Sequence, residues 1–394
     1  MKTRVEGESL VIFVEGRIDS ANSGQILREI GETLAQHPGL RPVLDADGLV
    51  YISSAGLRVL MQISRTLPDR LTVRNVRPEI YEVFDVTGFT TLLNVTRRPR
   101  EISVDGCPVI GRGAIGTVYR IDPDTIVKVY NLPDSMPMIQ NEQRLSRLAF
   151  LKGIPTAIPF DIVRVGEKYG TVFELVKADN YNALLVREPE RSEEIIREYG
   201  ELVRQVHRVL MAPGDVPDAR LIYAGFADEC AGLLGPDLTG RLKERILDMP
   251  VDLHAVHGDL HMKNVMRSDG EPMLIDMETL CTGNPVFEFA GMYNAYCAFM
   301  ADDPGNAEEF FGISAALCSR VYQETLKRCV GEEDAGALRE AGEKARLLGR
   351  LHFLQMIAVR GISKPELRDI RIRRSLEIIR DLTGRLGDLR IREQ

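Results

Sequence analysis

Several features that define large protein classes are missing from this sequence of 394 residues. No apolar run approaches the ~18 residues that a membrane-spanning helix needs. Acidic residues precede the first short apolar run, so the N-terminus does not have the pattern of a secretory signal. The six cysteines are scattered and include no CxxC pair, which indicates reduced and mostly buried thiols. These absences together predict a cytoplasmic protein that does not span a membrane.

An excess of positive charge is missing as well. Residues 1–98 carry 12 Lys and Arg against 12 Asp and Glu, and residues 99–394 carry 38 against 46, which gives the net charge of −8. An acidic chain argues against general nucleic-acid binding, because that function needs a basic face. The stretch from Glu366 onward is rich in arginine, but its hydrophobic residues recur roughly at helical spacing. It predicts an amphipathic helix with solvated or paired arginines, and a patch that binds a partner or a membrane is the alternative.

The first part of the sequence alternates short strand-like runs with helical ones. Such alternation in a short segment is typical of a small α/β domain. The expected strands are 9–15, 41–45 and 71–76, and the expected helices are 22–36, 54–67 and 78–86. Neighbouring arginines around Pro99 then indicate a linker at residues 99–101, so the first domain is predicted to cover residues 1–98.

The remaining residues, 102–394, are predicted to form a larger α+β domain of two lobes. Residues 102–176 are rich in strand patterns, with one helix at 138–151 and a strand at 171–176. Helical patterns dominate residues 177–394, apart from a strand, a loop and a second strand within 256–275. A small strand-rich lobe followed by a larger helical lobe is the architecture of an enzyme that holds a nucleotide between two lobes.

A glycine-rich loop lies between two strand-like runs near the start of the second domain. Gly111, Gly113 and Gly116, followed by Val118, form a GxGxxGxV pattern. Glycine has no Cβ, so its backbone amide can approach a phosphate closely. No helix follows the loop directly, which argues against a dinucleotide-binding fold. Taken alone, the pattern also fits an ordinary hairpin that contains three glycines.

Lys128 lies in the next predicted strand, between apolar residues. An ammonium group in such surroundings favours a buried anion, and the alternative is a surface lysine whose aliphatic stem is packed. Glu142 follows 14 residues later in the predicted helix and is placed to pair with Lys128. A solvated glutamate is the alternative for that position.

The segment His257-Gly-Asp-Leu-His-Met-Lys-Asn264 places a carboxylate and an amide five residues apart on one loop. Asp259 is suited to accept a proton from an attacking hydroxyl, and the amide oxygen of Asn264 is suited to hold a magnesium ion. Asp276 ends an apolar strand, where it is placed to bridge a metal ion to nucleotide phosphates. A plain turn at Asp259 and a helix cap at Asp276 are the alternatives. His257 and His261 are expected to support the loop rather than bind zinc, because helix-type zinc spacing and a nearby cysteine are both missing.

In this order these elements resemble the aminoglycoside phosphotransferase and choline kinase branch of the protein-kinase-like superfamily, over residues 105–360. The resemblance implies a two-lobed kinase-like fold and the use of ATP and Mg²⁺. Asp259 would then be the catalytic aspartate, and Lys128 would bind phosphate. Asn264 and Asp276 would be the metal ligands.

The same resemblance implies two further features. Residues 173–176 would form the hinge between the lobes, where the backbones of Glu174 and Val176 would bind adenine. The branch also carries a glycine-proline-aspartate-like segment after the metal-binding aspartate, which here reads Gly283-Asn-Pro-Val-Phe-Glu288. Glu288 stands where aspartate is more usual, and its role is left open.

Residues 8–98 resemble the STAS domain, the fold of bacterial anti-sigma-factor antagonists. The specific part is Tyr51-Ile-Ser-Ser-Ala-Gly-Leu57, and further agreement is found in segments 14–19, 43–48 and 85–88. In that family the phosphorylated serine falls at Ser54, and the preceding position, Ser53 here, is usually aspartate. Ser54 is expected to begin a helix, where its hydroxyl would cap free amides and a phosphate would face the positive end of the helix dipole. A simple capping serine is the alternative.

Two functions are compatible with this sequence. The first is an ATP- and Mg²⁺-dependent phosphotransferase for an alcohol, with a small molecule as the expected acceptor and the STAS domain as a regulatory or docking module. The second is a signalling partner-switch protein whose kinase-like half binds nucleotide or phosphorylates a protein serine such as Ser54. The joint presence of Lys128, Asp259, Asn264 and Asp276 favours the enzyme. Transfer to Ser54 within one chain is disfavoured, because a short linker restricts the reach of the serine. The sequence does not encode the identity of the acceptor.

Overall fold

The chain divides into two compact units. The computed structural model describes residues 1–113, 115–132, 135–176, 179–268, 270–331 and 335–393. The first unit comprises Met1–Ser103 together with Ile162–Glu167, and the second comprises Val104–Asp161 together with Lys168–Gln394. Arg100 and Glu101, which lie in the expected linker, form the short strand β8 (Arg100–Glu101), which pairs in parallel with β12 (Pro159–Val165).

The first unit is built on a twisted five-stranded sheet in the order β1-β2-β4-β6-β7. Its strands are β1 (Thr3–Glu6), β2 (Ser9–Phe13), β4 (Arg41–Asp45), β6 (Thr72–Val76) and β7 (Asn94–Arg97). Only the β1–β2 pair among them is antiparallel. Three consecutive residues of β2, Leu10 to Ile12, are fully buried, as expected for a strand covered on both faces. A second small sheet pairs β3 (Gly16–Ile18) with β5 (Leu49–Ile52).

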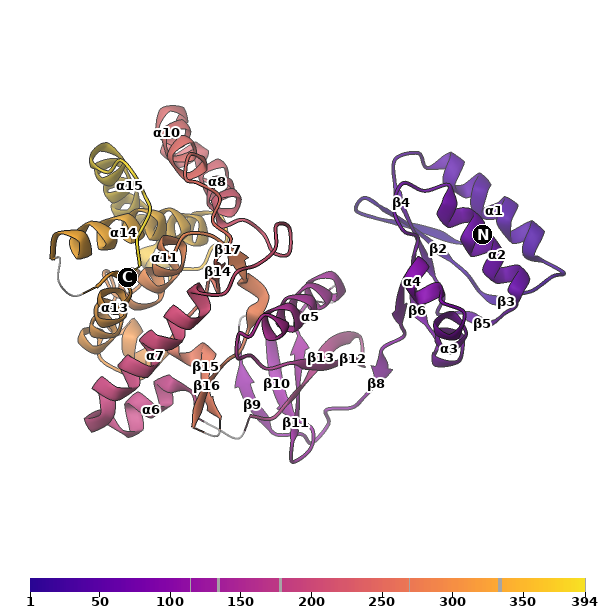
Figure 1. Cartoon of the computed structure of the whole chain (residues 1–394), viewed down its shortest axis with the longest axis horizontal. Coiled ribbons are helices and arrows are strands. Elements are labelled where there is room, and N and C mark those ends of the chain that lie inside the picture. The colour runs from indigo at the N-terminus through magenta and orange to yellow at the C-terminus, as the bar shows by residue number, and fades with distance from the viewer. Residues whose placement is uncertain (114, 133–134, 177–178, 269, 332–334, 394) are drawn as a thin grey trace. The chain divides into compact units, whose positions relative to one another are not determined.

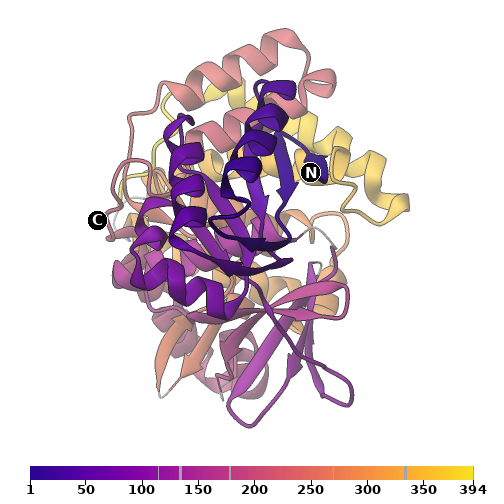
Figure 2. The same ribbon diagram turned by 90° about the vertical axis from the view of Figure 1, so that its right-hand side faces the viewer.

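Helices complete this small α/β unit. They are α1 (Ser23–Gln36), α2 (Ser54–Arg65), α3 (Pro78–Val86) and α4 (Phe89–Leu92). The first two lie side by side, as both views of the ribbon show (Figure 1 and Figure 2). The strands β1, β3 and β5 and the short helix α4 were not expected from the sequence, because segments of three or four residues carry too little periodicity to be recognised.

The strand-rich part of the second unit forms the small lobe. Its strands are β9 (Val109–Arg112), β10 (Gly116–Arg120), β11 (Thr125–Tyr130) and β13 (Lys168–Glu174). These four strands pair antiparallel in the order β13-β11-β10-β9. Helix α5 (Met136–Leu151) packs against this sheet, as Figure 1 shows. The sheet and α5 together position the glycine loop, Lys128 and Glu142.

The rest of the second unit is mainly helical. Its helices are α6 (Tyr181–Arg187), α7 (Ser192–His207), α8 (Ala219–Glu229), α9 (Ala231–Leu234), α10 (Pro236–Leu247), α11 (Val286–Tyr293), α12 (Asn306–Phe311), α13 (Ala315–Val330), α14 (Ala335–Ala358) and α15 (Arg368–Arg385). Two short antiparallel pairs lie among them: β14 (Ala255–Val256) with β17 (Cys281–Thr282), and β15 (Val265–Ser268) with β16 (Glu271–Leu274). In the described part of the chain, no helix has both the length and the hydropathy needed to cross a membrane.

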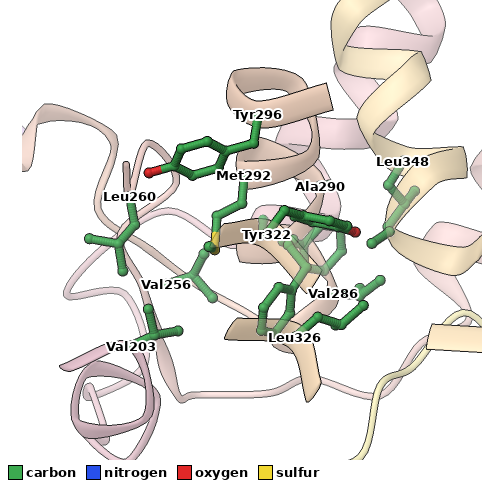
Figure 3. Packing of buried hydrophobic residues seen from close by; sticks show 14 of the residues in the cluster. Val203, Val256, Leu260, Val286, Ala290, Met292, Tyr296, Tyr322, Leu326 and Leu348 are labelled. Carbon is green, nitrogen blue, oxygen red and sulfur yellow. The ribbon is translucent and has the colours of Figure 1, made fainter. Parts of the chain in front are cut away.

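Helix α11 is the centre of the helical lobe. Six of its eight residues are buried, as is typical of a helix that is apolar on all sides. Figure 3 shows Met292 of this helix beside Val256 and Leu260, which lie on either side of Asp259 in the sequence. The main core therefore extends directly beneath the loop that carries the expected catalytic residues.

The arginine-rich helix α15 differs from its expected amphipathic pattern in one respect. Ile370 is 43% exposed, whereas Arg371 is only 2% exposed. The Arg371 guanidinium donates to the Phe299 carbonyl and to the Ser363 hydroxyl, over 3.2 and 3.1 Å. Arg385 pairs with Asp381 on the same helix. Hydrogen bonds therefore partner the two terminal nitrogens of the buried Arg371, so the face that α15 turns toward the protein includes a charged residue that a hydropathy pattern assigns to solvent.

Candidate active site

Asp259 lies on a sharply turned loop between β14 and β15. Gly258, just before it, has φ +84°, and a Cβ at that position would lie 2.9 Å from the Thr279 carbonyl oxygen. Only glycine fits both the left-handed backbone and the close approach. The side chain of Asp259 is 53% exposed, so its carboxylate is accessible to a substrate.

The side chain of Asn264 contacts Asp259 directly. Asn264 Nδ2 lies 2.9 Å from the Asp259 carbonyl oxygen and 3.3 Å from its Oδ2. With the amide nitrogen donating to Asp259, the amide oxygen of Asn264 is directed away from it. The Ile275 amide donates to the Asn264 carbonyl over 2.9 Å, at the end of the β15–β16 hairpin. This pairing explains how Asp276, the next residue, comes to lie at the same end of the hairpin as Asn264.

Asp276 adopts a left-handed backbone conformation, with φ 64° and ψ 64°. Such a conformation is uncommon for residues other than glycine, and it is concentrated at functional sites. Asp276 occupies the N-cap position of the short turn Met277–Thr279, but its side chain makes no capping hydrogen bond. Its Oδ1 instead lies 3.3 Å from Lys128 Nζ. The helix-cap alternative for Asp276 is therefore wrong.

Lys128 stands between two carboxylates in the small lobe. Its Nζ lies 3.1 Å from Glu142 Oε1, so the ion pair expected from the sequence is present. Burial lowers the pKa of Lys128, but Asp276 and Glu142 outweigh it and raise this pKa above its ordinary value. The other oxygen of Glu142 accepts a 2.5 Å hydrogen bond from the Tyr130 hydroxyl, whose oxygen is 3.2 Å from Thr171 Oγ1. Tyr130, which sequence reasoning missed, fixes the glutamate through the carboxylate oxygen that is not paired with Lys128.

The site carries more acid than base. Glu142, Asp259, Asp276 and Glu278 provide four carboxyl groups near the ammonium of Lys128. Burial and the neighbouring Asp276 raise the pKa of Glu278 to about 7. Sequence reasoning gave Glu278 no role, although its position two residues after Asp276 was a usable signal.

A magnesium ion fits this donor set. Across the described residues, no group of three or more His, Cys, Asp or Glu is placed to hold a metal ion by itself. Mg²⁺ prefers oxygen ligands, and it is commonly held by one or two protein groups together with substrate phosphates and water. The oxygens of Asn264 and Asp276 and the surplus negative charge meet that requirement.

The glycine loop is a hairpin between β9 and β10, which the Gly113 amide closes by donating to the Gly116 carbonyl over 2.9 Å. A Cβ at Gly116 would lie 2.7 Å from the Val129 carbonyl oxygen, whereas one at Gly113 would have only the Gly116 oxygen, at 3.9 Å, nearby. Gly111 packs against Val118, and Ala114 of the loop lies outside the described residues. Strand packing therefore requires glycine at position 116, whereas it does not require glycine at position 113.

The expected hinge, residues 173–176, begins within the last two residues of β13. Glu174 is the last residue of that strand and lies opposite Thr125 of β11. The Leu175 amide donates to the Asp124 carbonyl over 2.7 Å. Val176 lies beyond the end of the strand. Residues 177 and 178 lie outside the described part of the chain.

Glu288 supports the loop that carries Asp259. Its side chain is fully buried and accepts the amide hydrogens of His257 and Gly258, over 2.7 and 3.1 Å. Burial raises the pKa of Glu288, but His207 of α7, whose Nε2 lies 3.7 Å from Glu288 Oε2, outweighs it and lowers this pKa. Glu288 therefore acts as a buried anion that binds two loop amides.

The two histidines of the loop lie in different surroundings. His257 Nδ1 accepts from the Asp259 amide over 3.3 Å, and its Nε2 lies 3.3 Å from the Ile275 carbonyl, so this ring links the loop to the hairpin end. The His261 ring contacts Phe310 and Phe311 edge-on. Its Nε2 is 3.8 Å from Asp259 Oδ2, and burial lowers the pKa of His261. The contacts of His257 and of His261 fit the expectation that these two residues support the loop.

Residues 106–313, more than half of the chain, match the model of the phosphotransferase enzyme family. The chain belongs to this family. Its second unit is therefore a phosphotransferase with a kinase-like fold. Residues 1–94 match a second family, described as Mlab, STAS domain. A curated protein of Bordetella bronchiseptica, named as an anti-sigma factor antagonist, BtrV, is 34% identical over 89 residues, which are 22% of this chain and 76% of that protein. The first unit is thus a STAS domain.

Solved structures of aminoglycoside phosphotransferases resemble the chain at low identity. A thermostable mutant of APH(4)-Ia in its apo form is 14% identical, with a TM-score of 0.49, over 71% of this chain and 94% of that chain. ADP-bound APH(2'')-Ib is 13% identical, with a TM-score of 0.48, over 78% of this chain and 99% of that chain. At these scores the two structures add nothing to the family assignment.

Two adjacent serines of the STAS domain, Ser53 and Ser54, have different positions relative to helix α2. Ser53 Oγ accepts from the amides of Ala55 and Gly56 over 3.2 and 3.4 Å, so Ser53 caps α2. Ser54 is the first residue of that helix and is exposed. The expectation that the Ser54 hydroxyl caps the helix is wrong by one residue, because the cap precedes the first helical residue.

Proposed function

We propose that this phosphotransferase moves the γ-phosphoryl group of ATP to the hydroxyl of a small alcohol, with Mg²⁺ as cofactor. The observation that carries the proposal is the junction of Lys128, Glu142 and Asp276 beside the Asp259–Asn264 pair. A lysine held between a buried glutamate and a metal-type aspartate is the arrangement that phosphoryl transfer from a nucleotide requires. We infer that the STAS domain regulates the enzyme or docks a protein partner.

The side chains at this junction then have distinct roles, and Asn264 has two. Asp259 takes the proton of the acceptor hydroxyl, and Asn264 orients that carboxylate through its amide nitrogen. The Asn264 oxygen and Asp276 would hold Mg²⁺, which offsets the charge of the phosphate oxygens when it is bound. Lys128, kept in place by Glu142, binds the nucleotide phosphates.

The remaining contacts to the nucleotide come from the backbone. The loop of Gly111, Gly113 and Gly116, with Val118 beside it, covers the phosphates. The Glu174 carbonyl and the Val176 amide bind adenine at the hinge. This division leaves the side chains of the glycine loop and the hinge without a direct part in the chemistry.

The proposal is tested by two matched variants, assayed with ATP, Mg²⁺ and a panel of alcohols that includes amino sugars and choline. Asp259→Asn is expected to keep nucleotide affinity and to lower turnover by about 10²–10⁴-fold. Asp276→Asn is expected to weaken nucleotide binding only when Mg²⁺ is present, because it removes a metal ligand. Wild-type turnover in the first variant, or equal Mg²⁺-dependent affinity in the second, would remove that residue from its role.

A second candidate function rests on the exposed Ser54 and on the similarity of the first unit to an anti-sigma factor antagonist. In this reading the STAS domain is a partner switch, and Ser54 accepts phosphate from a kinase. Intact-mass and peptide analysis after incubation with ATP and Mg²⁺ tests it. Stoichiometric phosphate on Ser54 in the wild type, absent in Asp259→Asn and independent of protein concentration, would show transfer within one chain, which we do not expect.

A further inference from the structure

The chain after α15 returns to α11, the helix that carries Glu288 (Figure 1). We name residues 386–393 the tail. Its residues Leu389 and Ile391 are buried. The Ile391 amide donates to Asn284 Oδ1 over 2.8 Å, and Asn284 Nδ2 donates to the Ile391 carbonyl over 3.0 Å. Asn284 lies two residues before α11, so these paired hydrogen bonds fix the tail beside that helix.

Glu393 reaches the buried end of α7 from this tail. His207 is the last residue of α7, and its Nδ1 lies 2.7 Å from Glu393 Oε1. Its other ring nitrogen, Nε2, lies 3.7 Å from Glu288 Oε2. The ring is 1% exposed and therefore stands between two carboxylates, one from the tail and one from α11. A cation at this position is also favoured by the negative end of the α7 dipole.

The charge of this ring depends on its neighbours. Burial lowers the pKa of His207, but Glu288 and Glu393 outweigh it and raise this pKa to about 9. The edge of the ring faces Phe289, with ring centres 6.1 Å apart. Other titratable groups that interact with Glu288 are His257, Tyr199, Tyr223 and Cys281. Cys329 lies beside Glu393, with Arg204 and Glu201 near that thiol.

We propose that Glu393 is a positioning residue for the catalytic loop, acting through His207 and Glu288. The Glu393 carboxylate keeps the His207 ring protonated and fixes its orientation. The protonated ring keeps Glu288 ionised at a position that solvent does not reach, where an unpaired carboxylate would be costly. The ionised Glu288 holds the two amides that precede Asp259. The consequence for catalysis rests on the proposed function, whereas the coupling from tail to loop does not.

The test compares Glu393→Gln with Arg392→Gln, which removes a charge from the exposed neighbouring residue. Both variants are made in the full chain. Amide hydrogen exchange at residues 257–259 and the NMR titration of the His207 ring are measured. In Glu393→Gln, exchange is expected to be about tenfold faster and the His207 pKa lower by about one unit or more. Arg392→Gln should match the wild type.

A second variant, Glu393→Asp, keeps the charge on a shorter side chain. It should lie between Glu393→Gln and the wild type in both measurements, and it carries the test if Glu393→Gln does not fold. The proposal would be overturned if the Glu393 variants had the same amide exchange rates at residues 257–259 and the same His207 pKa as the wild type.

Turnover separates this proposal from the proposed function. Glu393→Gln is expected to lower kcat with little change in nucleotide affinity, and unchanged kcat together with faster exchange would overturn the catalytic consequence. A wild-type chain that transfers no phosphate from ATP, but shows the expected exchange and titration, would refute the proposed function and support the coupling.

Discussion

Lys128 Nζ lies 3.3 Å from Asp276 Oδ1, although the two residues are 148 positions apart in the sequence. The contact joins the strand of the small lobe to the turn that follows the β15–β16 hairpin. Glu142 binds the same ammonium group from α5. The three residues therefore interact electrostatically as a group, and removing Lys128 deprives both carboxylates of this cation.

The first prediction concerns this unit. Lys128→Met is expected to lower the free energy of unfolding by about 3 kcal/mol, because it leaves Glu142 buried and unpaired. Phosphoryl transfer should fall about 10²–10³-fold, since a cation that faces the phosphates is lost. The double variant Lys128→Met/Glu142→Gln should recover much of the stability and none of the activity. Urea unfolding and kcat/KM measure the two effects, and a double variant as unstable as the single one would contradict the pairing.

The second prediction separates two glycines of the same loop. Gly116→Val is expected to destabilise the protein by about 1–3 kcal/mol, because its side chain would press against the Val129 carbonyl. Gly113→Val should leave stability near that of the wild type and raise the KM for ATP, because its Cβ meets no close neighbour in the described residues and would crowd the phosphates instead. Thermal unfolding and ATP kinetics distinguish the two. Equal behaviour of both variants would mean that the loop does not cover the nucleotide.

The third prediction concerns the dependence of stability on pH. The pKa of His207 is raised from 6.5 to about 9 in the folded chain, because Glu288 and Glu393 outweigh burial. The stabilisation from the charged ring is therefore fully present below pH 6.5 and is lost as pH rises through 9. Urea unfolding at pH 6, 7.5 and 9.5 should show this decline. His207→Gln should flatten it, and an equally steep decline in that variant would assign the effect to other groups.

The fourth prediction concerns the start of α2 in the STAS domain. Ser53→Ala is expected to destabilise the helix by about 1 kcal/mol, because it removes the cap of the Ala55 and Gly56 amides. Ser54→Ala should change stability by less than about 0.5 kcal/mol, because the residue is exposed and makes no cap. Hydrogen exchange of the α2 amides in the full chain measures both. A larger effect at Ser54 would reverse the assignment of the cap.

The family resemblance left the role of Glu288 open, and the structure gives this residue a physical role. The substitution of glutamate for the more usual aspartate keeps a carboxylate at this position. That carboxylate is long enough to bind both the His257 and the Gly258 amides from within α11. The sequence showed the residue, but its partners became visible only when the loop and the helix were placed together.

The sequence by itself determined the chemistry of the candidate site. The glycine loop, Lys128 and the segment from His257 to Asn264 are local patterns, whose residue types and order already indicate phosphoryl transfer. The main strands and helices were also readable, because their hydrophobic residues recur with the period of the element. Strands of three or four residues, such as β3 and β5, were not, because so few residues carry no period.

The tertiary structure alone decided which groups hold those chemical residues in place. Tyr130, His207 and Glu393 have no local pattern that marks them, and their partners lie 12, 81 and 186 positions away in the chain. A hydrogen bond or an ion pair depends on distances of about 3 Å. Such distances arise only when strands, helices and the tail pack into one core, so the sequence lists the interacting groups without showing which of them meet.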